Sequence, residues 1–264
     1  MNTEKTYAYK DMTIRYTVAG APKRGAILFL HPAFADSRVF EKQAAFFQGD
    51  YLVITADMPG HGGSPLRREQ VDTGHMPDIA AGILKECGVS KAHLVGVSLG
   101  SLVAQGVAQV YPALAASVTV VGGYSIHKDN EDTLRAQKKE ILKWLWQMVV
   151  SFEALKRRMV LSSAASEEGR AVLAESVSGF TRRSFRGMGG MNRLFVRRDE
   201  PVEYPLLIIT GGKDMPLALE AGRRLAAMEP SATHKIIDNA GHCANIDEPE
   251  AFNAILSAFL SGLA

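Results

Sequence analysis

Short apolar runs separated by helical patterns set the fold of this chain more than any other feature. Six runs lie near residues 26–30, 51–56, 92–97, 117–121, 205–210 and 233–237. Continuous apolar strands of this length suit a parallel sheet that helices cover on both faces. Two more polar segments, Thr6–Lys10 and Thr13–Val18, read as an N-terminal hairpin. The sequence therefore predicts an α/β fold with a mostly parallel eight-stranded sheet.

The alternation stops between Gly123 and about Glu200, where helical patterns replace strands. Apolar residues recur there at steps of three and four, which predicts one helix face; they are Ile141, Leu145, Met148, Phe152, Leu155 and Met159. We expect a helical cap over 124–200, inserted after the sixth strand, and a core domain formed by 1–123 and 201–264. Most of this apolar face is expected to pack internally, with Trp144 and Met148 as candidates to line an apolar substrate pocket.

One junction between a strand and a helix has the pattern of a nucleophile elbow. The strand 93–97 leads into Gly96-x-Ser98-x-Gly100, and a helical pattern follows to Tyr111. A serine on such a sharp turn has its hydroxyl pushed clear of the backbone, and the glycines avoid clashes in the bend. Ser98 is thus the candidate nucleophile, and the alternative is a serine that only caps the helix.

A serine nucleophile needs a base, which an acid must orient. Strand 205–210 leads to Asp214, and strand 233–237 leads to His242. The carboxyl ends of parallel strands are where ligands bind in sheets of this kind, and Ser98, Asp214 and His242 all follow strands. Asp238 is the rival acid, but it ends the strand that leads to His242 itself, so Asp214 is favoured.

The motifs together resemble those of the α/β-hydrolase fold superfamily, over almost the whole chain. Besides the elbow, the matching segments are His31-Pro-Ala-Phe34, Asp57-Met-Pro-Gly-His-Gly-Gly-Ser64, Gly211-Gly-Lys-Asp214 and Ala240-Gly-His242. The order serine, acid, histidine is the one this superfamily uses. The resemblance implies a Ser98–Asp214–His242 triad in a core that carries a cap.

The resemblance also implies an oxyanion hole of two backbone N–H groups, those of Ala33 and Leu99. Phe34 is the alternative to Ala33, and it is also a candidate substrate contact. The chain departs from the family at Pro32, where glycine is usual. Proline lacks an N–H and restricts its own φ and the preceding residue, so the change stiffens the loop without removing a needed donor.

Composition fits a compact enzyme. The 264 residues carry a net charge of only +2, and no nucleic-acid motif is evident, which disfavours a nucleic-acid partner. Cys87 and Cys243 cannot form a disulfide scaffold, and the polar start 1–6 does not resemble a signal peptide. No apolar run approaches the ~18 residues of a membrane span. We expect a cytoplasmic protein with no membrane association, as a monomer or homodimer.

Charge within the expected cap is uneven. Residues 124–200 contain 15 Lys and Arg against 10 Asp and Glu, and six arginines fall between Arg182 and Arg198. A solvated basic face is the favoured interpretation. The alternative is that Arg182 and Arg183 hold a substrate carboxylate or phosphate, or that the face docks an acidic carrier protein.

The remaining histidines favour structural roles. His31 and His61 are expected to brace loops, and His93 to be buried in its strand. The sequence has no zinc-ligand spacing and no phosphate-binding glycine loop, so neither a metal nor another cofactor is expected.

The expected reaction is hydrolysis of a carboxylic ester, lactone or thioester of a small molecule through an acyl-enzyme on Ser98. Two alternatives are kept. One is C–C bond hydrolysis or a perhydrolase activity on the same triad, because one fold supports many reactions. The other is a ligand sensor that retains the triad but turns over little.

Overall fold

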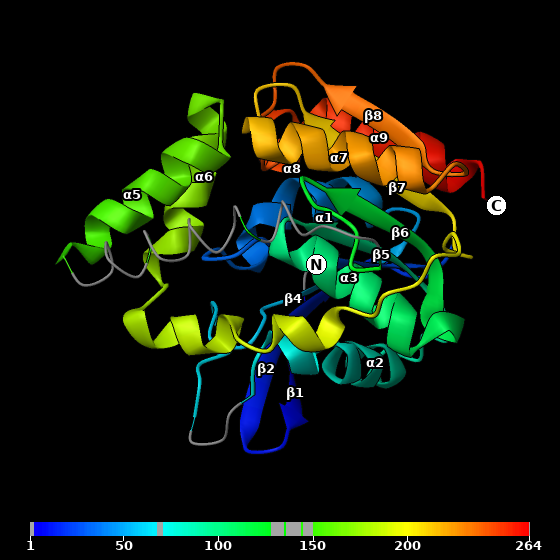
Figure 1. Ribbon diagram of the computed structural model, residues 1–264. Helices are drawn as coiled ribbons and strands as arrows, with labels where there is room; N and C mark the ends of the chain where they lie inside the picture. The colour runs from blue at the N-terminus through cyan, green and yellow to red at the C-terminus, as the bar shows by residue number, and fades with distance from the viewer. Residues whose placement is uncertain (1–2, 68–70, 128–134, 136–143, 145–149, 264) are drawn as a thin grey trace.

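A single eight-stranded sheet forms the centre of the molecule (Figure 1). The structure is a computed structural model that describes residues 3–67, 71–127, 135, 144 and 150–263. The strands are β1 (Thr3–Tyr9), β2 (Met12–Ala19), β3 (Ala26–Leu30), β4 (Leu52–Ala56), β5 (Ala92–Val97), β6 (Ala115–Val121), β7 (Leu206–Gly211) and β8 (Thr233–Ile237). Their order is β1-β2-β4-β3-β5-β6-β7-β8. Only β2 runs against its neighbours, so the predicted mostly parallel sheet is confirmed.

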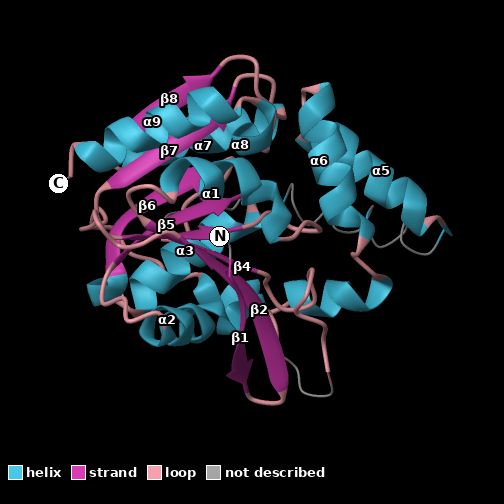
Figure 2. Ribbon diagram, turned by 180° about the vertical axis from the view of Figure 1, so that it is seen from behind, coloured by secondary structure: helices cyan, strands magenta, loops and turns pink. Residues whose placement is uncertain are grey.

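The central strands are apolar on both faces because helices cover both. In β3, Ala26, Leu28 and Leu30 enter one core, while Ile27 and Phe29 enter the other. The first core is closed by α2 (Met76–Glu86), α3 (Leu99–Val110) and α7 (Pro216–Met228), and the second by α1 (Glu41–Phe47) and α9 (Pro249–Ser261). Figure 2 shows the helices on the two sides of the sheet. This is the layered arrangement that continuous apolar strands predict.

The segment between β6 and β7, called here the β6–β7 insertion, contains no strand among its described residues. It contains α5 (Phe152–Ser163), α6 (Glu167–Ser178) and the 3-10 helices η4 (Arg182–Met188) and η5 (Met191–Leu194). In Figures 1 and 2, α5 and α6 form a pair that stands beside the layered core.

The prediction that one continuous helix carries the apolar face from Ile141 to Met159 is wrong, because the chain leaves the helical conformation at Ser151. Ser151 is extended, with φ −158° and ψ 101°, and its hydroxyl accepts the Ala154 N–H as the cap of α5. This side-chain bond begins a new helix at Phe152, a local signal that the apolar spacing does not register. Leu155 and Met159 are buried as that spacing predicted. Ile141, Leu145 and Met148 lie outside the described residues.

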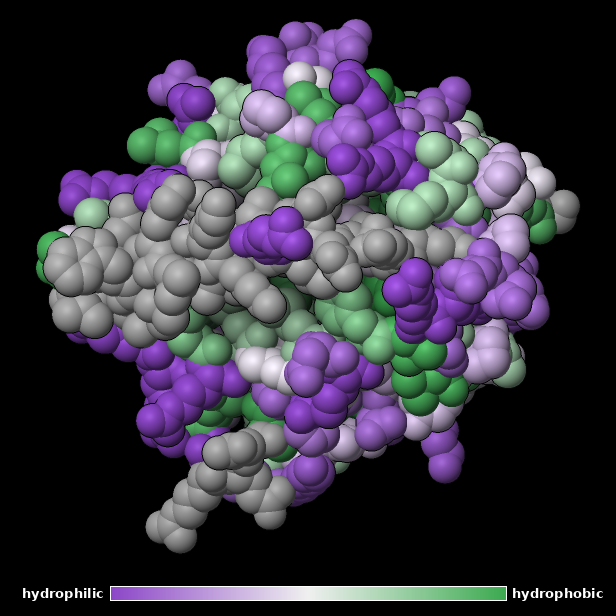
Figure 3. Space-filling view, viewed as in Figure 1, coloured by the Kyte–Doolittle hydropathy of each residue, from purple (hydrophilic) through white to green (hydrophobic). Residues whose placement is uncertain are grey.

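The face in Figure 3 is a mosaic of hydrophilic and apolar residues. No helix of the described ranges is both long enough and apolar enough to cross a bilayer. Both cysteines are free thiols, as expected: Cys87 is half-buried, and Cys243 is buried directly after His242.

Candidate active site

Ser98 lies at the turn between β5 and α3 in a strained backbone conformation. Its φ of 52° and ψ of −115° fall outside the regions that a non-glycine residue favours, at a cost of about 1–3 kcal/mol. The flanking glycines make the turn possible. A Cβ at Gly96 would collide with the Gly100 carbonyl, and one at Gly100 with the Leu30 carbonyl. The surrounding chain therefore holds Ser98 in the geometry that the elbow pattern predicts.

The hydroxyl of Ser98 is not used to cap α3. Instead the backbone of Ser98 is fixed: its N–H donates to the Val121 carbonyl at 2.8 Å, and its carbonyl accepts the Ser101 hydroxyl at 2.6 Å. The interpretation of Ser98 as an ordinary helix cap is therefore wrong. The half-buried side chain remains available for another role.

His242 and Asp214 form a buried pair on neighbouring loops. His242 Nδ1 lies 2.9 Å and 3.1 Å from the two Asp214 carboxylate oxygens, and the Asp214 side chain is fully buried. Asp214 Oδ1 also accepts the Met215 N–H at 2.7 Å. Asp238, the rival acid, is exposed. Because Nδ1–H donates to the carboxylate, Nε2 is left as the free base of the imidazole.

Backbone contacts set the positions of these loops. Gly212 N–H donates to the Ile237 carbonyl, and Lys213 N–H donates to the Ala240 carbonyl, both at 2.8 Å. The end of β6 lies against both halves of the site. Val121 accepts the Ser98 N–H, while a Cβ at Gly122 would lie 2.9 Å from His242 Nδ1. The fold therefore brings Ser98, Asp214 and His242 to one edge of the sheet.

The electrostatics of the pair favour a basic imidazole. Burial by itself would lower the pKa of His242, but the charge of Asp214 and its hydrogen bond outweigh burial and raise the pKa above 6.5. Asp214 therefore stabilises the imidazolium that forms when His242 accepts a proton.

This raised pKa predicts how turnover depends on pH. A base must be neutral to accept a proton, so kcat/KM of any reaction in which His242 is the base should fall in acid with a midpoint above pH 6.5. In Asp214→Asn, burial is no longer opposed by a charge, so the midpoint should move to lower pH. Rate profiles of both proteins between pH 4 and pH 9 test this. Identical midpoints would contradict the coupling of His242 to Asp214.

The candidate oxyanion donors come from two places, the start of α3 and the loop after β3. Leu99 is the first residue of α3, where an N–H has no intrahelical acceptor. Ala33 is half-buried, and the next residue, Phe34, has a φ of 69°. His31 accepts the Met58 N–H through Nε2 at 2.9 Å and donates from Nδ1 to the Pro32 carbonyl at 2.8 Å. His31 thus braces the loop, as predicted.

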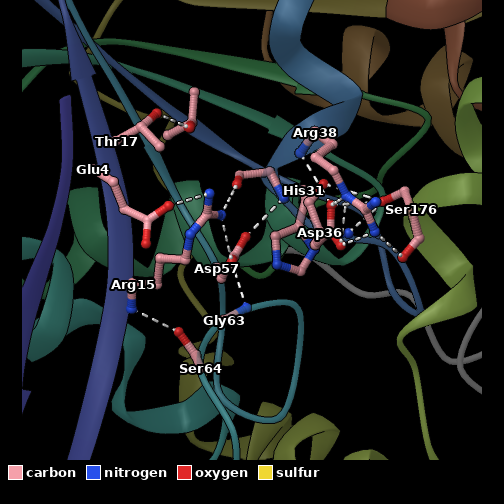
Figure 4. A network of polar contacts seen from close by, with 12 residues as sticks. Glu4, Arg15, Thr17, His31, Asp36, Arg38, Asp57, Gly63, Ser64 and Ser176 are labelled. Carbon is pink, nitrogen blue, oxygen red and sulfur yellow. Dashed lines mark hydrogen bonds and ion pairs between the residues drawn. The ribbon is translucent and has the colours of Figure 1, made fainter. Parts of the chain in front are cut away.

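Buried charges extend this support beneath the loop (Figure 4). Asp57 accepts the N–H groups of Ser37 and Gly63, both at 2.8 Å, and pairs with Arg15 at 3.1 Å. Burial alone would raise the pKa of Asp57, but the N–H groups of Gly63 and Ser37 that donate to its carboxylate favour the charged form and lower the pKa. The carboxylate therefore stays charged and tethers the start of η1 (Ser37–Phe40).

The ring of Phe34 joins this loop to the β6–β7 insertion. Its centroid lies 4.8 Å from that of Phe180 and 5.4 Å from those of Trp144 and Phe185. The sequence singled out Phe34 and Trp144 as pocket residues, and the structure places their rings in contact. Phe180 and Phe185 were missed because nothing in their spacing marks them. Met148 lies outside the described residues.

Four arginines between Arg182 and Arg198 contact other groups of the chain. The Arg182 guanidinium lies 5.4 Å from the centre of the Phe152 ring, and Arg183 donates to the Arg67 carbonyl at 2.9 Å. Arg193 pairs with Asp72, and Arg198 donates to the Pro201 carbonyl. Arg182 and Arg183 are both exposed, and the Phe152 ring that Arg182 contacts lies 6.3 Å from that of Phe180.

His61 braces its own turn by donating from Nδ1 to the Pro59 carbonyl at 3.0 Å. Burial lowers the pKa of His61 to about 3, so its imidazole is neutral near pH 7. His93 is partly rather than fully buried and contacts the Ser117 hydroxyl at 2.9 Å. Within the described ranges, no three His, Cys, Asp or Glu side chains gather where they could hold a metal ion.

The strand order and the parallel core are those of the α/β-hydrolase fold. Residues 27–255 match the model of the Alpha/beta hydrolase family. The chain therefore belongs to this family and is a hydrolase.

Individual relatives are distant but span nearly the whole chain. An (E)-2-((N-methylformamido)methylene)succinate hydrolase of Acinetobacter baylyi is 26% identical over 241 residues, 89% of each chain. The 3-oxoadipate enol-lactonase 2 of the same species is 23% identical over 265 residues, 97% of this chain and 96% of its own. A solved esterase from Thermogutta terrifontis superposes with a TM-score of 0.79 at 17% identity, covering 100% of this chain and 99% of that one.

Proposed function

We propose that the protein hydrolyses a carboxylic ester, lactone or thioester of a small molecule, with Ser98 as nucleophile, His242 as base and Asp214 as the orienting acid. The buried Asp214–His242 hydrogen bond beside the strained Ser98 turn carries the proposal. Nε2 of a histidine held in this way is free to accept the proton of a serine hydroxyl.

The proposed reaction has two steps. Ser98 Oγ bonds to the carbonyl carbon and gives its proton to His242, while the N–H groups of Ala33 and Leu99 donate to the oxyanion. His242 then passes the proton to the leaving group, which departs and leaves the acyl-enzyme. Water next attacks this ester and loses a proton to His242, and His242 passes that proton to Ser98 Oγ as the bond to the acyl carbon breaks and the acid is released. Each oxyanion donor is typically worth about 2.7–4 kcal/mol of the barrier.

The proposal gives residues 124–200 the role of a cap over this site, on a core of 1–123 and 201–264. The aromatic contacts of Phe34 with Phe180 and Phe185 support it, because they join the insertion to the loop that carries Ala33. Apolar rings at this position suit an apolar acyl or leaving group.

A screen of p-nitrophenyl esters, lactones, acyl thioesters and vinylogous 1,5-diketones tests the reaction class. We expect multiple turnovers on at least one ester, lactone or thioester, and covalent labelling of Ser98 by a fluorophosphonate. Turnover confined to the diketones would indicate C–C bond hydrolysis instead. A single turnover accompanied by a rise in melting temperature would indicate a ligand sensor.

We further propose that Arg182 and Arg183 favour substrates that carry a carboxylate. Both relatives above are named for dicarboxylates, a substituted succinate and 3-oxoadipate. Both arginines are exposed, Arg182 lies against the Phe152 ring of the proposed cap, and exposed charges attract an anion weakly.

Removing both charges in Arg182→Ala/Arg183→Ala is expected to raise KM for a carboxylate-bearing ester roughly 2- to 30-fold, because each of the two exposed pairs contributes about 0.2–1 kcal/mol. KM for a matched neutral ester should hardly change. High salt should remove the difference in KM between wild type and variant on the carboxylate-bearing ester, since salt screens exposed charges over about 8–10 Å. Arg224→Ala, on α7, is the matched control. An unchanged ratio of the two KM values at low and high salt would show that these arginines only form a solvated surface.

A further inference from the structure

The carboxylate of Asp247 joins the histidine loop to the β6–β7 insertion. The histidine loop is residues 238–243, between β8 and α8 (Ala244–Asp247). Asp247 Oδ2 accepts the N–H groups of Gly241 and Ala165, both at 2.8 Å. Its Oδ1 accepts the N–H and the hydroxyl of Ser166, also at 2.8 Å. Asp247 is buried, with 7% of its surface exposed. Its single carboxylate therefore holds the backbone next to His242 against the start of α6.

Further bonds strengthen this junction. Ser166 is the N-cap of α6, and its hydroxyl accepts the Gly169 N–H at 2.9 Å while donating to Asp247. Cys243 N–H donates to the Ser163 carbonyl at the end of α5, at 2.8 Å. The two neighbours of His242 are thus both tied to the junction of α5 and α6. Gly241 is tied through Asp247, and Cys243 is bonded directly to Ser163.

The other end of α6 is fixed to the loop after β3. The Ser176 hydroxyl accepts the Asp36 N–H at 2.7 Å and donates to Asp36 Oδ1 at 3.1 Å. Arg38 pairs with Asp36 at 2.8 Å and donates to the Glu175 carbonyl at 2.9 Å. A cation at the carbonyl end of a helix also interacts favourably with the helix dipole. Figure 4 shows Asp36, Arg38 and Ser176 converging at this point.

We propose that α6 is a rigid connection that holds the histidine loop and the oxyanion loop, residues 31–36, at a fixed spacing. Asp247 and Asp36 are its positioning residues, one at each end. The 12 residues of α6 span about 18 Å. The proposal rests on the function proposed above, because it assigns the two loops their catalytic roles.

This arrangement predicts that the two ends act together. If α6 is released at either end, it no longer fixes the spacing, and both His242 and the oxyanion donors lose alignment. Misplacement by about 1 Å can lower a rate by roughly 100-fold. The loss is expected in the chemical step, since neither aspartate is part of the proposed substrate pocket.

The test measures Asp247→Asn, Asp36→Asn and the double variant in the full chain. We expect each single change to lower two rates about 10- to 100-fold. They are kcat on p-nitrophenyl butyrate and the rate of inactivation by a fluorophosphonate. KM should change little, and the acid limb of the kcat/KM profile should shift as the His242–Asp214 bond loosens. In the double variant the loss should be smaller than the product of the single losses, because the connection is already broken.

Glu229→Gln is the matched control. Glu229 is also a buried carboxylate that accepts a backbone N–H, that of Val202 at 2.9 Å, but its loop is not part of the site. It should lower the melting temperature while leaving the inactivation rate unchanged. If Asp247→Asn does not fold, Ser176→Ala removes only the hydroxyl at the far end of α6, and it should still slow inactivation.

The outcomes separate this inference from the proposed function. A wild-type protein that never reacts with the fluorophosphonate would refute the function. Wild-type reactivity with unchanged rates in the folded Asp247→Asn and Ser176→Ala variants would overturn the positioning role alone. Losses that multiply in the double variant would show two separate local supports and would likewise overturn the connection through α6.

Discussion

Replacing Ser98 with alanine is expected to lower kcat by about a million-fold, the loss typical of removing a nucleophile from a complete triad. Alanine keeps the size of the side chain but has no oxygen to form the acyl-enzyme. The melting temperature should stay close to that of the wild type, because the Ser98 hydroxyl does not cap α3. Steady-state rates on the best ester of the screen, together with thermal unfolding, measure both effects.

Ser101→Ala provides the comparison. The Ser101 hydroxyl donates to the Ser98 carbonyl and supports the turn without being placed to react. It should cost some stability and only a small part of the rate, and the fluorophosphonate should still label Ser98. Full activity of Ser98→Ala, or labelling of another residue in the wild type, would end the serine hydrolase proposal.

Removing the imidazole in His242→Ala is expected to be nearly as damaging as removing the nucleophile, because members of a triad act as a unit. Asp214→Asn should cost less, about 10⁴-fold in kcat, since the imidazole remains but is no longer held in the productive tautomer. Steady-state and single-turnover rates of both variants near neutral pH provide the measurement.

Asp238→Asn is the control for the acid. Asp238 is exposed, whereas the Asp214 side chain is fully buried against His242. The exposed variant should keep near wild-type activity. A larger loss in Asp238→Asn than in Asp214→Asn would reverse the assignment of the acid.

The sequence predicted the core of the sheet because each inner strand is a short, unbroken apolar run. The outer hairpin was less well placed: β1 spans Thr3–Tyr9, where Thr6–Lys10 was expected. Most of β1 is exposed, and its pairing with β2 through residues such as Thr3 and Val18 fixes its register. An exposed polar strand of this kind leaves little hydrophobic pattern to read.

In the candidate site, too, residues marked by a local motif were predicted, and residues that act through distant partners were not. The turn at Ser98 and the loops of Asp214 and His242 each follow a strand and carry their signal within a few residues. The roles of Asp36 and Asp247 depend instead on partners 140 and 82 residues away. No local pattern identifies such a pair, because only the folded topology brings the two segments together.

Not every local signal was used. Ser151 could have been used to divide the predicted helix. Serine is a preferred N-cap residue, because its hydroxyl can accept the free N–H of the second or third residue of a helix. The basic stretch containing Arg182 and Arg183 shows the opposite case, in which composition alone could not reveal the contacts with Phe152 and the Arg67 carbonyl. The cytoplasmic location, the oligomeric state and the acidic carrier stay predictions.

The distant anchoring of α6 also bears on how the protein reaches its native state. Contacts between residues far apart in sequence form late, since the chain must close a long loop before any contact is gained. The N-terminal anchor of α6 joins segments 82 residues apart, so this helix cannot dock fully until Asp247 has been synthesised and placed. A chain that has assembled β1 to β6 can thus have much of its sheet while the proposed triad is still incomplete. Enzyme activity therefore reports completion of folding more stringently than secondary-structure content does.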